Sequence, residues 1–317
     1  MLLTAAVTCI VLFTTWGGTT YAWGSGIMVS LAVASVVLVV LLLVVEHRVA
    51  EPVVPVHLFK LGTFNVSSSV SFITGVAMFG GIAFLPLFLQ VVNGASATSS
   101  GFLLMPFMLG LLAASMAAGQ VITRTGHYKV FPIAGTALAG VALYLLSTMD
   151  TGTTRTTVTV YMVLLGVGIG LSMQTLVLAV QNVVKLTELG AATSSVTFFR
   201  TMGGSIGVAL FGALFNHQLA HRLQVTIDAG EASGFSPTLI RRLPEPQRTE
   251  LLTAFADSLT TVFLYAVPLV LLAFALTWLL RAVPLRSTIF AVDDHTGPED
   301  GPAPDPAEPA VPTTLLP

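Results

Sequence analysis

Long runs of apolar residues fill most of this chain, and no charged side chain occurs between Met1 and Val45. A helix needs about 20 apolar residues to cross the roughly 30 Å hydrocarbon layer of a membrane. Eight runs approach or reach this length, and only the first is short. They cover approximately residues 1–16, 24–45, 65–92, 101–122, 131–149, 158–181, 192–215 and 259–280. The pattern predicts a polytopic membrane protein.

The composition and the length of the runs restrict the fold to a bundle of helices. Charged residues make up 9% of the chain, whereas soluble domains carry roughly a quarter, so lipid must solvate much of the surface. Backbone groups in lipid are satisfied only within helices or closed barrels. Barrel strands would be about 10 residues long with alternating polarity. The longer runs do not alternate, so they predict an all-α fold with eight transmembrane helices.

A signal peptide is the alternative interpretation of the first run. This run has no basic start and no small-residue cleavage site, and a second long run follows at once. We therefore interpret it as a transmembrane helix or the remaining part of one. Cys9 is the only cysteine of the chain, which excludes an internal disulfide and a cysteine-based metal site.

The sequence does not support an enzymatic function. The stretch Gly203-Gly-Ser205-Ile-Gly207 matches the nucleophile-elbow expression, but that chemistry needs a strand-to-helix turn with a histidine and an acid in reach. Here the match lies inside an apolar run, and every histidine lies in a loop, at a helix end or in the tail. No P-loop, dinucleotide fingerprint or zinc-helix motif occurs. The net charge of −2 comes without a basic block, which argues against nucleic acid as a partner. We expect no enzyme activity, cofactor or metal site.

The lysines and arginines of the loops predict the orientation, because cytoplasmic loops are enriched in them. If the first helix runs outward, the short loops and the tail hold seven basic residues inside and one, Arg155, outside. The inner set is Arg48, Lys60, Arg124, Lys129, Lys185, Arg281 and Arg286. The external segment of about 216–258 holds four arginines, but long loops follow the rule less strictly. We expect a multi-pass protein of the plasma (cytoplasmic) membrane with a cytoplasmic carboxyl terminus.

Arg200 is a charged residue deep within an apolar run. It lies on the order of 15 Å along the helix from the start of its run, where a charge costs at least about 2.5–3.5 kcal/mol. We therefore expect it to face a water-filled cavity, a partner or backbone carbonyls, with snorkelling toward the inner surface as the alternative. All fifteen carboxylates lie in loops, at helix ends or in the tail. The spans therefore lack the acidic relay that proton-coupled carriers generally use.

Neutral polar residues are further candidates for a transport cavity, with interhelical hydrogen bonding as the alternative role. They are Gln90, Gln174, Gln181 and Asn182. The stretches Gly166-x-Gly168-x-Gly170 and Gly203-Gly204-x-x-Gly207 are interpreted as small residues on one helical face, where they allow neighbouring backbones to pack closely. A hinge role is the alternative for these glycines. Pro86 and Pro106 lie inside predicted spans and should bend or unwind them, as in the broken helices that line many transporter sites.

The segment Gly119-Gln-Val-Ile-Thr123-Arg124-Thr-Gly126-His-Tyr-Lys129 joins two spans on the predicted inner side. It resembles the cytoplasmic signature loop of the major facilitator superfamily, with Thr123 where that family usually has Asp. Glycines permit the tight turn, and basic side chains interact with helix C-termini. The resemblance implies that Gly119, Arg124, Gly126 and Lys129 belong to an inner gate.

Other stretches are similar to the fourteen-helix drug:proton antiporter branch of that superfamily. Pro86-Leu-Phe-Leu-Gln90, Gly94, Ser96-Ala97, Gly101 and Pro106 resemble its ninth-to-tenth helix region, and Phe198-Phe-Arg200 with Gly203, Gly204 and Gly207 its thirteenth helix. Trp16-Gly-Gly and Glu46-His-Arg48, with the stretch up to Phe59, resemble the flanks of its eighth helix. The resemblance implies that the chain corresponds to about helices seven to fourteen.

This correspondence implies a domain organisation. Residues 1–45 would hold two linking helices, 46–64 a cytoplasmic loop, 65–281 a carboxyl-terminal six-helix bundle and 282–317 a cytoplasmic tail. Residues 291–317 contain seven prolines, six carboxylates and no basic residue, so we expect the tail to be disordered.

The implied function is proton-driven export of drugs or small amphipathic metabolites, with the bundle rocking against an amino-terminal six-helix half. The proton gradient would be the coupling source, and the lipid bilayer, a small amphipathic substrate and that missing half would be the partners. The alternative is a truncated, non-transporting remnant or an accessory membrane subunit that needs a separate amino-terminal half.

Overall fold

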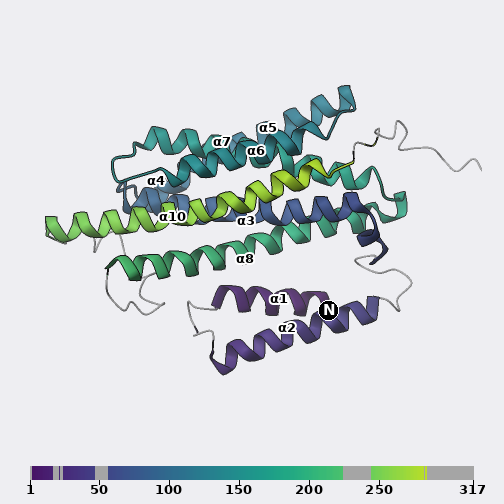
Figure 1. Cartoon of the computed structure of the whole chain (residues 1–317), viewed down its shortest axis with the longest axis horizontal. Helices are drawn as coiled ribbons and strands as arrows, with labels where there is room; N and C mark the ends of the chain where they lie inside the picture. The colour runs from purple at the N-terminus through teal and green to yellow at the C-terminus, as the bar shows by residue number, and fades with distance from the viewer. Residues whose placement is uncertain are drawn as a thin grey trace, which may run out of the picture. The chain divides into compact units, whose positions relative to one another are not determined.

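The computed structural model describes residues 2–16, 21, 24–46, 56–223, 244–281 and 283, and these residues are almost entirely helical. Two amino-terminal helices, α1 (Leu2–Trp16) and α2 (Gly26–Glu46), pack against each other. A short 3-10 helix, η1 (Val56–Lys60), leads into the remaining helices (Figure 1). These are α3 (Gly62–Val91), α4 (Ala97–Phe102), α5 (Met105–Thr125), α6 (Val130–Ser147), α7 (Arg155–Gln181), η2 (Leu186–Glu188), α8 (Leu189–Leu223) and α10 (Glu245–Trp278).

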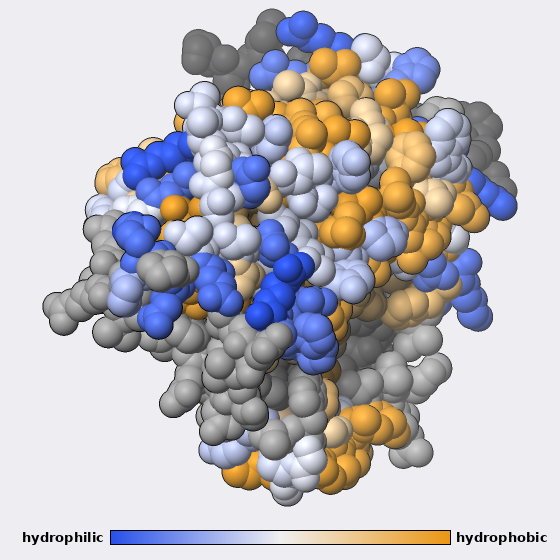
Figure 2. Space-filling view, turned by 60° about the vertical axis from the view of Figure 1, so that its left-hand side comes forward, coloured by the Kyte–Doolittle hydropathy of each residue, from blue (hydrophilic) through white to orange (hydrophobic). Residues whose placement is uncertain are grey.

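Within the described residues, six helices are long and apolar enough to cross a membrane, and α2 contributes a shorter apolar stretch. Large hydrophobic side chains on these helices face outward. On α5, Leu109, Leu112 and Met116 are each more than half exposed. Figure 2 shows a broad hydrophobic surface beside clusters of hydrophilic residues. Because water would not solvate such a surface, the chain is an all-α, multi-pass membrane protein, as the sequence predicted.

The six long helices form one bundle in which α3 and α7 are the most buried. The helix α3 packs against α7, α8 and α10, and α7 packs against α5, α6 and α3. The helices α3, α6 and α8 run in one direction, and α5, α7 and α10 run in the other (Figure 1). The loops with Lys60, Lys129 and Lys185 therefore lie at the same end of the bundle, as the topology requires. Which end faces the cytoplasm stays a prediction.

Glycines set the closest helix contacts. On α7, Gly166 and Gly170 lie against backbone atoms of Phe107 and Leu111 on α5. On α8, Gly203 lies against the backbone of Phe72, and Gly207 would place a Cβ 2.8 Å from the Cα of Val76 on α3. At these positions a side chain would meet backbone atoms, which cannot rotate away.

Gly168 corrects one sequence interpretation, because it does not share the helical face of its neighbours. A Cβ on Gly168 would lie 2.6 Å from the backbone nitrogen of Ala139 on α6, whereas Gly166 and Gly170 face α5. Two positions along an α-helix correspond to a rotation of about 200°. The three glycines therefore pack α7 against two different helices.

The ends of several elements differ from the sequence prediction. The connecting segment predicted at about 216–258 is partly helical, because helix α8 continues to Leu223 and α10 begins at Glu245. A helix satisfies its own backbone and can continue past the hydrocarbon layer. There Arg222 of α8 pairs with Asp257 of α10 at 2.9 Å. The predicted tail, 282–317, lies outside the described residues except for Val283.

Arg155, the basic residue that the charge rule leaves outside, has a structural role. Its guanidinium Nη2 donates to the carbonyl of Asn93 at 2.9 Å, and the side-chain amide of Asn93 donates to the carbonyl of Thr153 at 3.0 Å. These bonds join the turn after α3 to the turn before α7.

Candidate functional site

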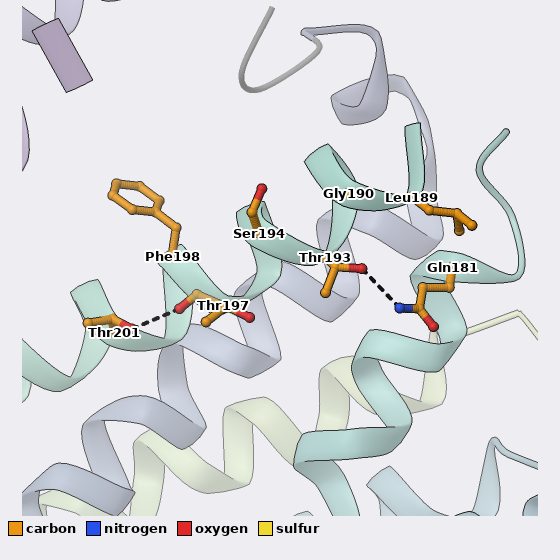
Figure 3. A pocket seen from close by; sticks show the side chains of 8 residues that line it. All are labelled: Gln181, Leu189, Gly190, Thr193, Ser194, Thr197, Phe198 and Thr201. Atoms are coloured by element: carbon orange, nitrogen blue, oxygen red, sulfur yellow. Dashed lines mark hydrogen bonds between the residues drawn. The ribbon is translucent and has the colours of Figure 1, made fainter. Parts of the chain in front are cut away.

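An open groove lies where the end of α7 meets the first turns of α8 (Figure 3). Its volume is about 770 Å³, within the range of small-molecule sites. Its lining residues come mainly from one face of α8. They are Gln181, Leu189, Gly190, Thr193, Ser194, Thr197, Phe198 and Thr201. Of these, the sequence analysis named Gln181 as a cavity candidate.

Most of the polar groups in the groove already have hydrogen-bond partners. Gln181 Nε2 donates to Thr193 Oγ1 at 3.0 Å, and this bond joins α7 to α8 (Figure 3). The hydroxyl of Ser194 donates to the carbonyl of Ala191 at 3.0 Å. The hydroxyl of Thr201 donates to the carbonyl of Thr197, also at 3.0 Å. The groove therefore presents mainly methyl groups, the leucine side chain and the Phe198 ring to a ligand.

Arg200 lies on α8 between two lining residues, Thr197 and Thr201. Residues three apart on a helix are surface neighbours, so Arg200 and Thr197 lie next to each other. The Arg200 side chain is only partly buried. Within the part of the chain that the structure describes, it makes no hydrogen bond or ion pair. On its other side, the Arg200 backbone lies against Gly75 of α3.

The other predicted cavity residues do not gather around Arg200. Gln90 donates to the Ser100 hydroxyl at 2.9 Å, near the other end of α3, about 22 Å along that helix from Gly75. Gln174 is exposed on α7, outside the groove lining. Asn182 donates to the carbonyl of Val283 at 3.3 Å and so contacts the chain after α10. Of the predicted cavity residues, Gln181 lines the groove, and Arg200 lies on α8 next to the lining residues Thr197 and Thr201.

The loop between α5 and α6 combines a tight turn with a contact to the last helix. Gly126 adopts a left-handed conformation with φ 72°, and its N–H bonds to the carbonyl of Ile122 at 2.8 Å. Lys129 Nζ donates to the carbonyl of Trp278 at 3.1 Å, and so interacts with a helix C-terminus, as expected from the dipole of that helix. Arg124 is exposed, and a Cβ added at Gly119 would meet nothing within 4 Å. Thr123 bonds to its own helix, at the carbonyl of Gln120.

Sequence reasoning missed Tyr128, which is the buried centre of this loop. Its side chain is 2% exposed. Its hydroxyl donates to the carbonyl of Arg281 at 2.8 Å and accepts from the N–H of Val283 at 3.1 Å. An aromatic residue between His127 and Lys129 in this loop was the sequence signal that could have indicated a buried anchor. Tyr128 and Lys129 together hold the end of α10.

Two further predicted positions affect helix shape. Pro86 lies inside α3. Pro106 lies inside the apolar span Thr98–Thr125, in the first turn of α5, directly after the turn residues Leu103 and Leu104 that separate α5 from α4. A proline is well tolerated in the first turn, where its missing N–H would have no helical partner.

Comparison with known proteins identifies relatives of this chain. Residues 1–208 match the family model described as Major Facilitator Superfamily. An uncharacterized MFS-type transporter of Mycobacterium tuberculosis (strain H37Rv) is 44% identical over 297 residues, covering 93% of this chain and 43% of the relative. A multidrug transporter protein of Bacillus subtilis (strain 168) is 29% identical over 311 residues, covering 89% and 57%. The chain thus spans about half the length of these curated relatives.

The fold also resembles a solved structure. This is the crystal structure of a bacterial homolog to the human lysosomal transporter Spinster, in an inward-facing and occupied conformation. The TM-score is 0.56 at 14% sequence identity, and the match covers 88% of this chain and 67% of that chain.

Proposed function

This chain belongs to the major facilitator superfamily, and we propose that it forms the carboxyl-terminal transport bundle of a proton-coupled exporter of small amphipathic compounds. The proposal places the chain in the fourteen-helix drug:proton antiporter branch. Its six-helix bundle would rock against an amino-terminal six-helix half around a central cavity. The groove between α7 and α8 would be part of that cavity.

The observation that carries this proposal is that Arg200, beside an open groove in the apolar part of α8, has no side-chain partner among the described residues. Intramembrane charges generally face water-filled cavities and mark substrate or ion pathways. The Bacillus subtilis relative is a multidrug transporter protein, which supports small-molecule transport. The described spans supply no acidic proton site near Arg200, so the proposal assigns proton coupling to the amino-terminal half.

Gene deletion in the native host tests the proposal, because the host holds any amino-terminal partner. Cells that lack the chain should accumulate more of at least one dye in a panel of fluorescent amphiphiles. The wild-type chain should restore efflux, and a protonophore should abolish it. Arg200→Ala should fail to restore efflux at an equal membrane level. Arg222→Ala is the matched control, because it removes an arginine of the same helix outside the groove. Unchanged accumulation of every dye after deletion would rule out export.

A further inference from the structure

We propose that the groove between α7 and α8 binds an amphipathic anion, whose acidic group pairs with Arg200 while its apolar body lies along α8. This inference rests on the proposed function, because it takes the groove as part of the transport site. It goes further by naming the chemical class of the substrate. Three features of the described residues carry it.

The first feature is an unmatched positive charge. The described part of α8 from Leu189 to Thr201 contains no carboxylate. The carboxylate next to this segment is Glu188, which already contacts His57 Nε2 at 3.1 Å. An arginine in a water-poor site costs free energy unless an opposite charge or an acceptor satisfies it. A carboxylate, sulfonate or phosphate on the ligand supplies this partner through charge-assisted hydrogen bonds.

The second feature is the positive charge on the segments that precede α3 and α8. Lys60, at the end of η1, and Lys185, just before η2, are both exposed. The contact between His57 and Glu188 joins η1 to η2, and η2 leads directly into Leu189 of the groove lining. Clefts lined by one sign of charge raise the local concentration of oppositely charged ligands. The lysines before the Leu189 end of the groove and Arg200 beside its Thr201 end therefore favour the same sign of ligand.

The third feature is the apolar character of the groove wall. The hydroxyls of Ser194 and Thr201 bond to carbonyls of their own helix, and that of Thr193 accepts from Gln181. The Phe198 ring projects from the lining helix (Figure 3). A sugar or a peptide would lose hydrogen bonds with water and gain few here. An aromatic or aliphatic body loses none. From Gly190 to Thr201 the helix rises about 16 Å, which fits a drug-sized molecule.

Equilibrium binding of three naphthalene derivatives to the purified chain in phosphatidylcholine nanodiscs tests the charge preference. The probes are naphthalene-2-sulfonate, the neutral 2-naphthamide and the cationic 2-naphthylmethylammonium, which share one ring system. We expect the anion to bind at least about tenfold more tightly than the cation, because one charge-assisted hydrogen bond changes the dissociation constant by about that factor. This preference should weaken at high salt, because the exposed charges of Lys60 and Lys185 are screened. Empty nanodiscs correct for partitioning into lipid.

Variants locate the binding. Arg200→Gln should remove the preference for the anion and leave binding of the neutral amide within about twofold, whereas Arg200→Lys should keep most of the preference. Thr197→Trp should weaken all three probes, because it fills the groove. If Arg200→Gln does not fold, binding of the three probes to Arg200→Lys and Thr197→Trp, compared with wild type, still tests where the anion binds. Equal or tighter binding of the cation to wild type would overturn the anion assignment and leave the export proposal standing.

An anionic lipid has the same chemistry as a soluble amphipathic anion, and a competition experiment separates the two sources. Phosphatidylglycerol is added to the nanodiscs at constant ionic strength. If lipid occupies the groove, the sulfonate should bind more weakly to wild type while the amide is also displaced. If the site takes soluble anions, the amide should be unaffected. Failure of all probes to bind wild type would overturn the groove as an anion site. The efflux experiment in the native host would still test export independently.

Discussion

Replacing Gly170 of α7 by alanine should destabilise the bundle. The added Cβ would lie 3.0 Å from the carbonyl carbon and from the Cα of Leu111, and still closer to the Leu111 oxygen. These are backbone atoms, so α5 as a whole must move away. Overpacking of this kind costs about 1–3 kcal/mol.

Two smaller effects accompany the overlap. The Ser115 hydroxyl of α5 donates to the Gly170 carbonyl at 2.8 Å. Separation of the helices breaks this bond, which is worth about 0.6 kcal/mol. In the opposite direction, alanine is favoured over glycine within a helix by up to about 1 kcal/mol. The net expectation is a loss of about 1–3 kcal/mol in the free energy of unfolding, since the two smaller effects nearly cancel.

Denaturation of the purified chain by SDS in mixed micelles measures this free energy. Gly119→Ala is the matched control, because Gly119 lies within α5 and a Cβ added there would meet nothing within 4 Å. It should be neutral or stabilising by up to about 1 kcal/mol. Ser115→Ala should cost less in the Gly170→Ala background than in wild type, because the same bond is already lost. Equal stability of Gly170→Ala and Gly119→Ala would refute the close-contact argument.

Three further changes test other contacts. Tyr128→Phe removes the hydroxyl that bonds to the carbonyl of Arg281 and to the following chain; we expect a loss of about 1–3 kcal/mol and faster proteolysis just after α10. Asp257→Asn breaks the ion pair with Arg222; the side chain of Asp257 is 42% exposed and that of Arg222 is 37% exposed. The loss in the free energy of unfolding should therefore stay below about 1 kcal/mol and shrink at high salt. Arg155→Gln removes the bond between the turn after α3 and the turn before α7; it should cost about 0.5–1.5 kcal/mol, and unchanged thermal unfolding would contradict that role.

The fold class was predictable from sequence because hydropathy depends on local composition alone. Apolar runs without alternation can satisfy their backbones in lipid only as helices. The ends of the helices were less predictable. Residues 216–223 and 245–258 are polar enough to indicate a loop, yet they are helical. The bond between Arg222 and Asp257 joins two helices that the sequence does not relate.

The candidate site was predictable only in part. Arg200 was found because a charge in an apolar run is conspicuous in a single sequence. Thr193, Thr197 and Thr201 were not found, although their spacing of four places them on one face of a helix. Threonines in membrane helices commonly bond to their own backbone, so such a pattern does not by itself indicate a ligand site. The partner of each glycine also depends on tertiary structure, as the different directions of Gly168 and Gly170 show.

The glycine contacts have a mechanical consequence for the bundle. Where α5 meets α7 and where α3 meets α8, the distance between helix axes is limited by one backbone touching another. At Gly166, Gly170 and Gly203 the contact is with backbone atoms, which cannot change rotamer to absorb a displacement. We therefore expect each pair to transmit force as one stiff unit and to move together. Compliance would then concentrate at the turn of Leu103 and Leu104, which interrupts the helical hydrogen bonding between α4 and α5.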